Sequence, residues 1–306
     1  MKIKILGTES LGVRGLSCQV EKGNQVIVID PGLALGYHRY GLLPHPAQVA
    51  VGEKVREQIM SALTQATDVV FSHYHGDHIP LENPNPFQLD LKKAAPLMQD
   101  AHLWAKGLKG LSPQMASRRS ALAETCGRVF LEVEGRSLGG FSFSHSVPHG
   151  QKGSRLGMVM MTRIEDNGQV FVHASDIQFL DEEPISLILD WEPDVVLAGG
   201  PPLYLDFMGK KLRKKARKQA LRLAAGVDTL ILDHHLLRSQ EGLHWLQELS
   251  TTAGHRVFCA ADYMGTSRRL LEAYRENLYE ETPIPEGWHE AYTEGIASTQ
   301  GYLREN

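Results

Sequence analysis

The chain has 306 residues, of which 42% are hydrophobic and 22% charged, so it is long enough for a sizeable core and has the composition of an ordinary globular protein. Its formal net charge of −4 at pH 7 excludes a strong overall attraction to nucleic acid or anionic membranes. Three well-separated cysteines argue against a disulfide framework, and no apolar run reaches the roughly 18 to 20 residues of a membrane span, so we expect a cytoplasmic protein with no membrane partner.

The order of the predicted elements follows from alternating apolar residues in strands and a 3.6-residue period in helices. The first half predicts strands at 2–6, at 17–22, from 25 to the turn at 30–32 and at 68–72, and helices at 50–66 and 112–127. The second half predicts strands within 128–148 and 156–176 with a hairpin turn at 166–168, a helix and a strand within 185–202, a basic helix at 211–226, a strand ending near 233, a further helix, and a strand within 256–265.

Two strand-rich halves, each followed by helices, predict one domain over residues 1–306. The expected fold class is α+β, with two packed sheets between two outer layers of helices in a four-layer αββα sandwich. The polar, proline-broken segment at about 79–126 is expected to form an inserted helical excursion. Residues from about 280 to 306 are expected to form a C-terminal tail on the outside.

The segment "FSHYHGDHIP" gathers three histidines and an aspartate directly after a short apolar run. His73 and His75 are two residues apart, so they point to the same side of an extended chain. Asp77 and His78 follow a glycine that lets the backbone turn toward a neighbouring position. This spacing predicts a site for two divalent metal ions, and its nitrogen and oxygen donors suit zinc first, with iron, manganese or nickel as alternatives.

The whole chain resembles the metallo-β-lactamase superfamily, in a branch found in archaea and some bacteria. The resemblance is carried by the segments "IDPGLALGYHRYGLLPHP", "SHYHGDH", "VPHGQKGSRLGMVM", "HASD", "GGPPLYL" and "LDHHLLR". It implies the αββα fold, with His73 and His75 on the first metal and Asp77 and His78 on the second. It also implies that Asp176 bridges both metals.

The resemblance implies three further site positions. His234 would complete the second metal site, with His235 orienting the substrate or donating a proton, although the two could be reversed. Asp30 would accept a hydrogen bond that orients a ligand imidazole. The last ligand of the first metal is His149, before "GQKGS", or His145 in "HSVP", and we favour His149.

Two such cations, bridged by a shared hydroxide, predict a dinuclear metal-dependent hydrolase. Arg118 and Arg119 in the excursion suit an anionic substrate, either a small phosphodiester or other ester or a nucleic acid. A lactonase, thioesterase or amidase acting on a small metabolite is the alternative enzyme. The non-enzyme alternative is a nucleic-acid-binding protein with structural metals and a basic patch on the helix at 211–226. The sequence does not determine the substrate, the metal, the general acid or the oligomeric state.

Overall fold

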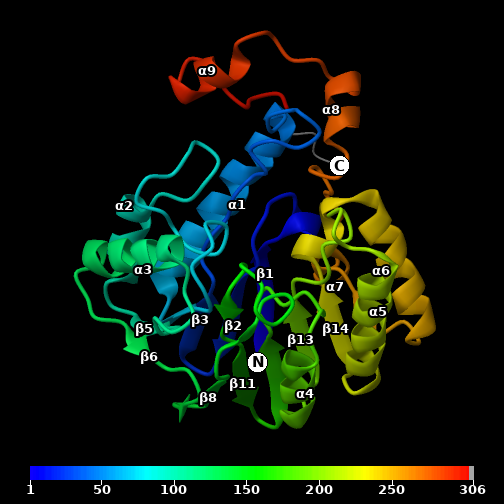
Figure 1. Cartoon of the computed structure of the whole chain (residues 1–306). Helices are drawn as coiled ribbons and strands as arrows, with labels where there is room; N and C mark the ends of the chain where they lie inside the picture. Colours follow the sequence, from blue (N-terminus) through cyan, green and yellow to red (C-terminus); the bar gives the residue numbers. More distant parts are fainter. Residues whose placement is uncertain (303–306) are drawn as a thin grey trace.

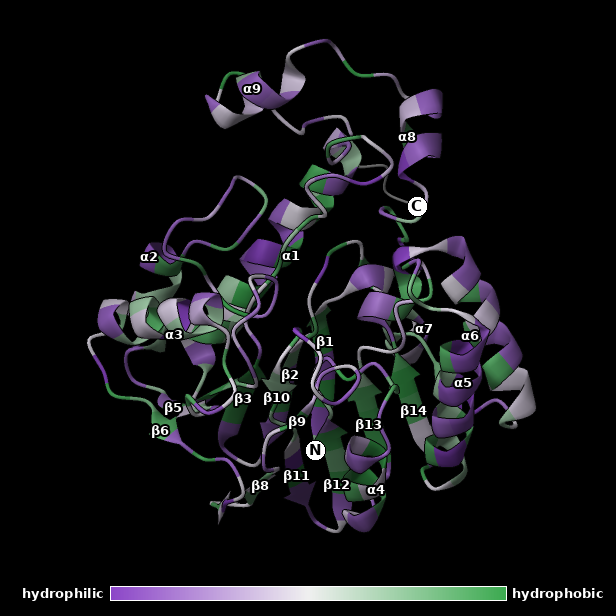
Figure 2. Cartoon of the chain, in the orientation of Figure 1, coloured by the Kyte–Doolittle hydropathy of each residue, from purple (hydrophilic) through white to green (hydrophobic). Residues whose placement is uncertain are grey.

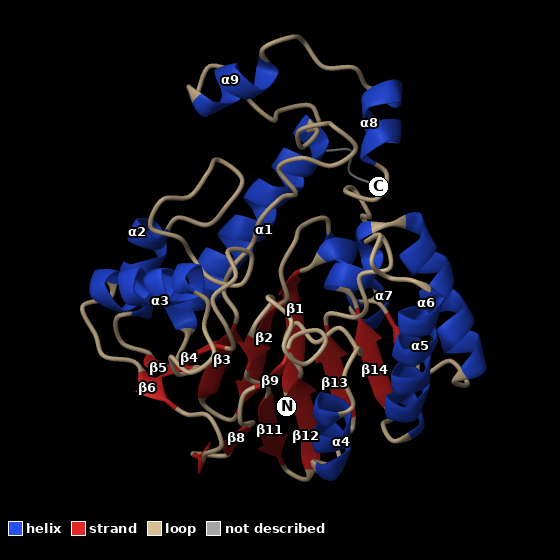
Figure 3. Ribbon diagram, viewed as in Figure 1, coloured by secondary structure: helices blue, strands red, loops and turns tan. Residues whose placement is uncertain are grey.

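The computed structural model describes residues 1–302 of the chain and shows two sheets packed face to face. Helices cover the outer face of each sheet, on the left and right sides of Figure 1, and the strands run together through the centre of Figure 3. This arrangement confirms the predicted four-layer αββα sandwich. Among the described residues, no helix has both the length and the apolar character that crossing a membrane requires.

The first sheet joins an antiparallel part to a parallel part. The first three strands are antiparallel and the remaining three run parallel to the third. In spatial order the strands are β1 (Lys2–Gly7), β2 (Ser17–Lys22), β3 (Gln25–Ile29), β4 (Asp68–Phe71), β5 (His102–Ala105) and β6 (Leu131–Glu132). Its helical layer consists of α1 (Pro46–Gln65), α2 (Leu91–Ala94), the 3-10 turn η2 (Ala95–Met98) and α3 (Pro113–Thr125).

The second sheet is built in a similar way, with a parallel part that continues into an antiparallel meander. In spatial order it contains β15 (Val257–Phe258), β14 (Thr229–Leu232), β13 (Val195–Ala198), β12 (Gln169–His173), β11 (Thr162–Asp166), β8 (Phe141–Phe143) and β7 (Ser137–Leu138). Its outer helices are α4 (Glu183–Asp190), α5 (Lys210–Ala225) and α6 (Gln240–Thr252). β9 (Val147–Pro148) pairs with β10 (Met158–Val159) in a separate two-stranded sheet. The remaining short elements are η1 (Glu9–Leu11), η3 (His234–Arg238) and α7 (Ala260–Tyr263).

Three hydrophobic clusters fill the three interfaces between the four layers. Ile27 and Ile29 of β3 belong to the cluster between the sheets, whereas Val28 belongs to the cluster under α1. In β13, Leu197 likewise faces the other sheet and Val196 faces the helices. Both faces of these strands are therefore apolar, as the green strands of Figure 2 show, and each fully buried side chain contributes about 1.5–3 kcal/mol.

The segment 79–126 differs from the predicted helical excursion. Residues 102–105 form β5, which pairs with β4 and β6 and is therefore part of the first sheet. The rest of the segment, which includes α2, η2 and α3, lies outside the sheet. The prediction missed this strand because His102–Ala105 is too short for alternation to be recognised within a polar, proline-rich segment.

The C-terminal segment contains α8 (Arg275–Glu281) and α9 (Trp288–Thr293), which Figure 1 shows above the N-terminal end of α1. Trp288 is buried in the cluster under α1, and the hydroxyl of Tyr292 donates to Glu53 of that helix at 2.9 Å. The predicted tail therefore covers α1, and its residues 303–306 lie outside the described part of the chain.

Candidate metal centre

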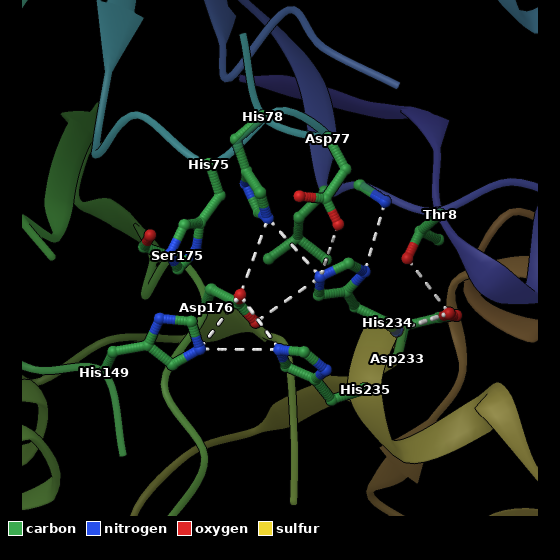
Figure 4. A network of polar contacts seen from close by, with 12 residues as sticks. Thr8, His75, Asp77, His78, His149, Ser175, Asp176, Asp233, His234 and His235 are labelled. Atoms are coloured by element: carbon green, nitrogen blue, oxygen red, sulfur yellow. Dashed lines mark hydrogen bonds and ion pairs between the residues drawn. The ribbon is translucent and has the colours of Figure 1, made fainter. Parts of the chain in front are cut away.

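The polar side chains predicted for the site follow the ends of strands that meet at one edge of the sandwich. The loop after β4 carries "SHYHGDH", and Asp176 follows β12. His234 and His235 begin η3 directly after β14, and His149 follows β9. Figure 4 shows these side chains converging, although they come from both sheets. In sheets with parallel strands, binding sites commonly lie just beyond the carboxyl ends of the strands, where the loops bring polar side chains together.

One group, called here the first cluster, comprises His73, His75, His149 and Asp176. Nε2 of His73 lies 3.0 Å from Nδ1 of His75, and Nε2 of His149 lies 3.1 Å from Oδ2 of Asp176. Bonds of about 2.0–2.1 Å to a tetrahedral zinc ion place the donor atoms about 3.3 Å apart. The first cluster therefore has the spacing of a metal-binding site.

A second cluster comprises Asp77, His78 and His234. Nε2 of His234 lies 3.4 Å from Nε2 of His78 and 3.5 Å from Oδ2 of Asp77. The Asp176 carboxylate reaches this cluster as well, with Oδ1 3.6 Å from His234 and Oδ2 3.7 Å from His78. Asp176 thus lies between the two clusters.

The two neighbouring histidines of "LDHHLLR" form a further group with Asp176, and each approaches a different oxygen of its carboxylate. His234 is fully buried in the second cluster. Nε2 of His235 lies 3.0 Å from Oδ2 of Asp176 and 3.4 Å from Nε2 of His149, on the side of the first cluster. The His235 side chain is 12% exposed, so it lies closer to solvent than His234.

Asp30 orients two of the histidines. It is fully buried, and its Oδ2 accepts from Nδ1 of His78 at 3.0 Å and from the Ser72 hydroxyl at 2.6 Å. Because the Ser72 proton is directed to Asp30, its Oγ accepts from Nδ1 of His73 at 3.0 Å. With Nδ1 as the donor, the neutral form of each imidazole presents an unprotonated Nε2 toward the site, which is the form that binds a metal.

Three non-glycine residues beside the clusters adopt left-handed backbone angles. The φ angles are 48° at Asp30, 57° at Ser175 and 50° at His234. Such conformations cost of order 1–3 kcal/mol each and are common at functional sites, where the surrounding fold enforces them. Here each one turns the chain sharply at a strand end and directs a polar side chain inward.

Two glycines make room for the centre. A Cβ on Gly32 would lie 2.2 Å from the carbonyl carbon of His78, so only glycine lets the loop after β3 pass against that backbone. A Cβ on Gly199 would lie 2.5 Å from Oδ1 of Asp176. The glycines of the "DPG" and "GGPP" segments therefore allow the chain to pass close to His78 and Asp176.

The charge states of the clusters follow from burial and from the neighbouring charges. Burial lowers the pKa of His73 well below its ordinary value, and lowers that of His75 to about 3. Burial would also lower the pKa of His78, but its hydrogen bond with Asp30 and the charge of Asp77 raise it to about 9. A cation that binds Nε2 of His78 must therefore displace a proton there.

The two inward-facing aspartates are ionised. Burial alone would raise the pKa of Asp77, yet the neighbouring imidazoles and the Arg238 guanidinium hold it well below its ordinary value, and the imidazoles around Asp176 do the same there. Oδ1 of Asp176 is buried and accepts no hydrogen bond from any described residue. A buried carboxylate oxygen without a donor, next to converging imidazole nitrogens, fits a divalent cation.

Three other residues predicted for the site differ in whether they approach the two clusters. His145 is exposed and lies 2.9 Å from Glu183, outside both clusters. Arg119 pairs with Glu132 at 2.6 Å. Arg118 donates to the carbonyl of Tyr74 at 3.3 Å, in the segment that carries the histidines. The structure therefore brings Arg118 toward the centre and leaves His145 and Arg119 away from it.

Asp233 and Arg238 also belong to the site, although the sequence analysis did not predict them. The Asp233 carboxylate accepts from Thr8, from the backbone N–H groups of Ser10 and His234 and from that of Ala260, which ties the loop after β1 to the loop after β14. Arg238 lies against the second cluster, with Nη2 3.2 Å from Oδ2 of Asp77. An arginine four residues after a histidine on a 3-10 turn could have suggested this contact.

Proteins of known sequence resemble the chain over its full length. A UPF0282 protein of Methanosarcina mazei is 48% identical over 303 residues, which cover 99% of this chain and 100% of that protein. The chain belongs to the UPF0282 family. A UPF0282 protein of Methanopyrus kandleri is 36% identical, with 91% of this chain and 99% of that protein covered. No family model matches the UPF0282 chain described here.

Among solved structures, an isothiocyanate hydrolase from Delia radicum gut bacteria is similar to this UPF0282 chain with a TM-score of 0.50. The sequence identity is 15%, and the match covers 85% of this chain and 95% of that one. At this identity the likeness concerns the fold alone. The four-layer architecture and this likeness together confirm the metallo-β-lactamase fold for the UPF0282 chain.

Proposed function

We propose that the protein is a metal-dependent hydrolase with two divalent cations, zinc first, that acts on a phosphodiester or another anionic ester. The observation that carries the proposal is the place of Asp176. Its carboxylate lies within 3.1 Å of His149 in the first cluster and 3.6 Å of His234 in the second. One carboxylate between two groups of imidazoles is the donor arrangement of a dinuclear centre.

Cations held there supply a water of lowered pKa as the nucleophile and polarise the ester group. The protein's own residues set the geometry for this chemistry. Asp30 fixes Nε2 of His73 and His78 toward the centre, and the Asp77 and Asp176 carboxylates offset part of the metal charge. His235, at the solvent side, is the candidate for moving a proton at Nε2.

Arg118 supports an anionic substrate. Its Nη1 is 3.3 Å from the Tyr74 carbonyl, and a Cβ on Gly76 would lie 3.5 Å from its Nη2. The guanidinium therefore lies over the backbone between His75 and Asp77, both of which are partly exposed. A planar cation at this position suits two oxygens of a phosphate or carboxylate.

The basic helix gives less support to a nucleic-acid-binding function. Arg213 of α5 forms an ion pair with Glu241, and Arg217 lies 3.5 Å from Glu248, both on the adjacent α6. Figure 2 shows α5 as an outer hydrophilic helix of the second sheet. Part of its charge is thus balanced within the fold, which favours the hydrolase over the basic-patch alternative.

The test measures metal content and turnover on the same preparations. We expect about two equivalents of metal, and turnover of bis(p-nitrophenyl) phosphate that a chelator abolishes. Asp176→Asn should lose metal and activity, whereas Asp190→Asn, at an exposed carboxylate at the end of α4, should keep both. Turnover of p-nitrophenyl acetate or a lactone without the diester would favour the small-ester hydrolase. Metal without any turnover would contradict the proposal.

A further inference from the structure

The second cluster contains the Asp77 carboxylate and, beside it, one cationic neighbour that the first cluster lacks, the guanidinium of Arg238. Its Nη2 lies 3.2 Å from Oδ2 of Asp77 and 3.0 and 3.2 Å from the two ring nitrogens of His234. Being almost equally near both nitrogens, the guanidinium lies over the face of the ring rather than in line with one lone pair. A permanent positive charge thus borders the donor atoms of the second cluster.

Arg238 is held in this position from its other side. Nε donates to Oε1 of Glu9 at 2.8 Å, and Nη1 donates to the hydroxyl of Tyr204 at 3.3 Å. Arg238 is 5% exposed and Glu9 2% exposed, so the guanidinium cannot turn to solvent without leaving buried hydrogen-bond partners unsatisfied. The guanidinium is therefore a fixed part of the second cluster's surroundings.

The hydrogen bonding of His234 also differs from that of the other ligand candidates. The backbone N–H of Gly15 donates to its Nδ1 at 3.1 Å. In a neutral imidazole with Nδ1 as acceptor, the proton is on Nε2, the atom that faces Asp77 and His78. His73 and His78 have the opposite arrangement, because their Nδ1 atoms face Ser72 and Asp30. Coordination through His234 Nε2 requires the Gly15 hydrogen bond to be given up or a further proton to be lost.

The first cluster has neither of these features. In the described residues, no lysine or arginine forms a hydrogen bond or ion pair with His73, His75 or His149. Its charged neighbour is the Asp176 carboxylate, 3.1 Å from His149. A cation there meets the negative charge of Asp176 and, at His73, an imidazole whose Nδ1 faces Ser72 and whose Nε2 faces the cluster.

We propose that the two clusters bind metal with different affinities, the first tightly and the second weakly. Arg238 and the Gly15 hydrogen bond both oppose a cation in the second cluster. The inference rests on the proposed function only in that metals bind. Repulsion between a divalent ion and a guanidinium a few ångströms apart exceeds the energy of a tenfold change in affinity, even at an effective dielectric constant of about 20. We therefore expect the second equivalent to bind at least about tenfold more weakly than the first.

The experiment titrates the metal-free full chain with Zn²⁺ in competition with a chromophoric chelator, and with Co²⁺ followed by absorption spectroscopy. The test variant is the double substitution Glu9→Gln and Arg238→Gln, which removes the guanidinium together with its buried partner Glu9 and leaves His234 beside Asp77. The matched control is Arg14→Gln with Glu272→Gln. That pair, with Nε of Arg14 2.7 Å from Glu272, is also buried on its carboxylate side, and among the described residues it forms no hydrogen bond or ion pair with a member of either cluster.

We expect two unequal equivalents in the wild-type protein. In the test variant the second affinity should rise at least about tenfold while the first stays unchanged, and the control should resemble the wild type. Two equal wild-type affinities, or loss of the second equivalent in the test variant, would overturn the inference while leaving the hydrolase proposal intact. A wild-type protein that binds no metal would overturn both. The wild-type ratio alone decides the question if the test variant does not fold.

Discussion

Nδ1 of His78 lies 3.0 Å from Oδ2 of Asp30, a residue 48 positions earlier in the chain. The same carboxylate also accepts from Ser72, which in turn accepts from His73. One buried aspartate therefore controls the tautomer of a histidine in each cluster.

Asp30→Asn should weaken metal binding. An amide NH₂ group would donate where the carboxylate now accepts from His78 and Ser72, and this would disturb the orientation of His78 and, through Ser72, of His73. Loss of a residue that hydrogen-bonds to a metal-binding histidine typically lowers metal affinity about 10- to 100-fold. Ser72→Ala should affect only the cluster that contains His73. Competition titration with a chelator measures both variants, and unchanged affinities in Asp30→Asn would show that Asp30 does not orient the ligands.

The segment after β8 contains two histidines with different surroundings. His149→Ala should lose at least one metal equivalent and reduce turnover at least about 100-fold, because it removes a donor from the first cluster. His145→Ala should retain both, since His145 is exposed and faces Glu183. Metal analysis and turnover on the two variants in parallel provide the measurement. The opposite result would assign the ligand to His145.

The neighbouring arginines of α3 provide a matched pair for substrate binding. Arg118→Ala should raise KM for an anionic diester about tenfold, the size expected for losing a hydrogen bond to a charged group. Arg119→Ala should leave KM unchanged, because Arg119 pairs with Glu132. Steady-state kinetics with a neutral ester as a second substrate checks the reason, since Arg118→Ala should not alter its KM. Equal effects of the two substitutions would exclude a specific role for Arg118.

Removal of metal should destabilise the protein. A ligand that binds only the folded state raises its stability with concentration, so the melting temperature should fall on chelation and recover when Zn²⁺ is added. In Asp176→Asn the response should be much smaller, because the carboxylate between the clusters is lost. Thermal unfolding with and without chelator is the measurement. An equal response of both proteins would place metal binding elsewhere.

The buried ion pair between Arg14 and Glu272 predicts a pH dependence of stability away from the metal centre. Burial would raise the pKa of Glu272, but the hydrogen bond and charge of Arg14 lower it to about 2 from an ordinary value of 4.5. Because the folded-state pKa is depressed, the stabilisation is present above about pH 4.5 and is lost as the pH falls toward 2.

Urea unfolding at pH 7, 4 and 3 measures this contribution. Glu272→Gln should be less stable than the wild type at pH 7, and the difference should shrink at pH 3. Glu286→Gln, at an exposed carboxylate, should follow the wild type throughout. A difference that stays constant with pH would show that Glu272 is not ionised in the folded protein.

Much of the fold was predictable from local patterns. The hairpin at 166–168 is present, with left-handed backbone at Asn167 and Gly168. The strand before "SHYHGDH" and α1 also occur where the apolar periodicity indicates. The four-residue strand β5 was missed, because its identity depends on pairing with β4 and β6 rather than on its own sequence.

The sequence by itself determined the chemistry available to the site: the spacing of "HYHGDH" and the strand-end position of Asp176 follow from local geometry. Only the tertiary structure separated His149 from His145, placed His234 in the second cluster with His235 near His149, and brought Arg238 against Asp77. The physical reason is that these relationships join residues from both sheets. Their distances depend on strand order and on the angles of the loops at the strand ends, which no local pattern encodes.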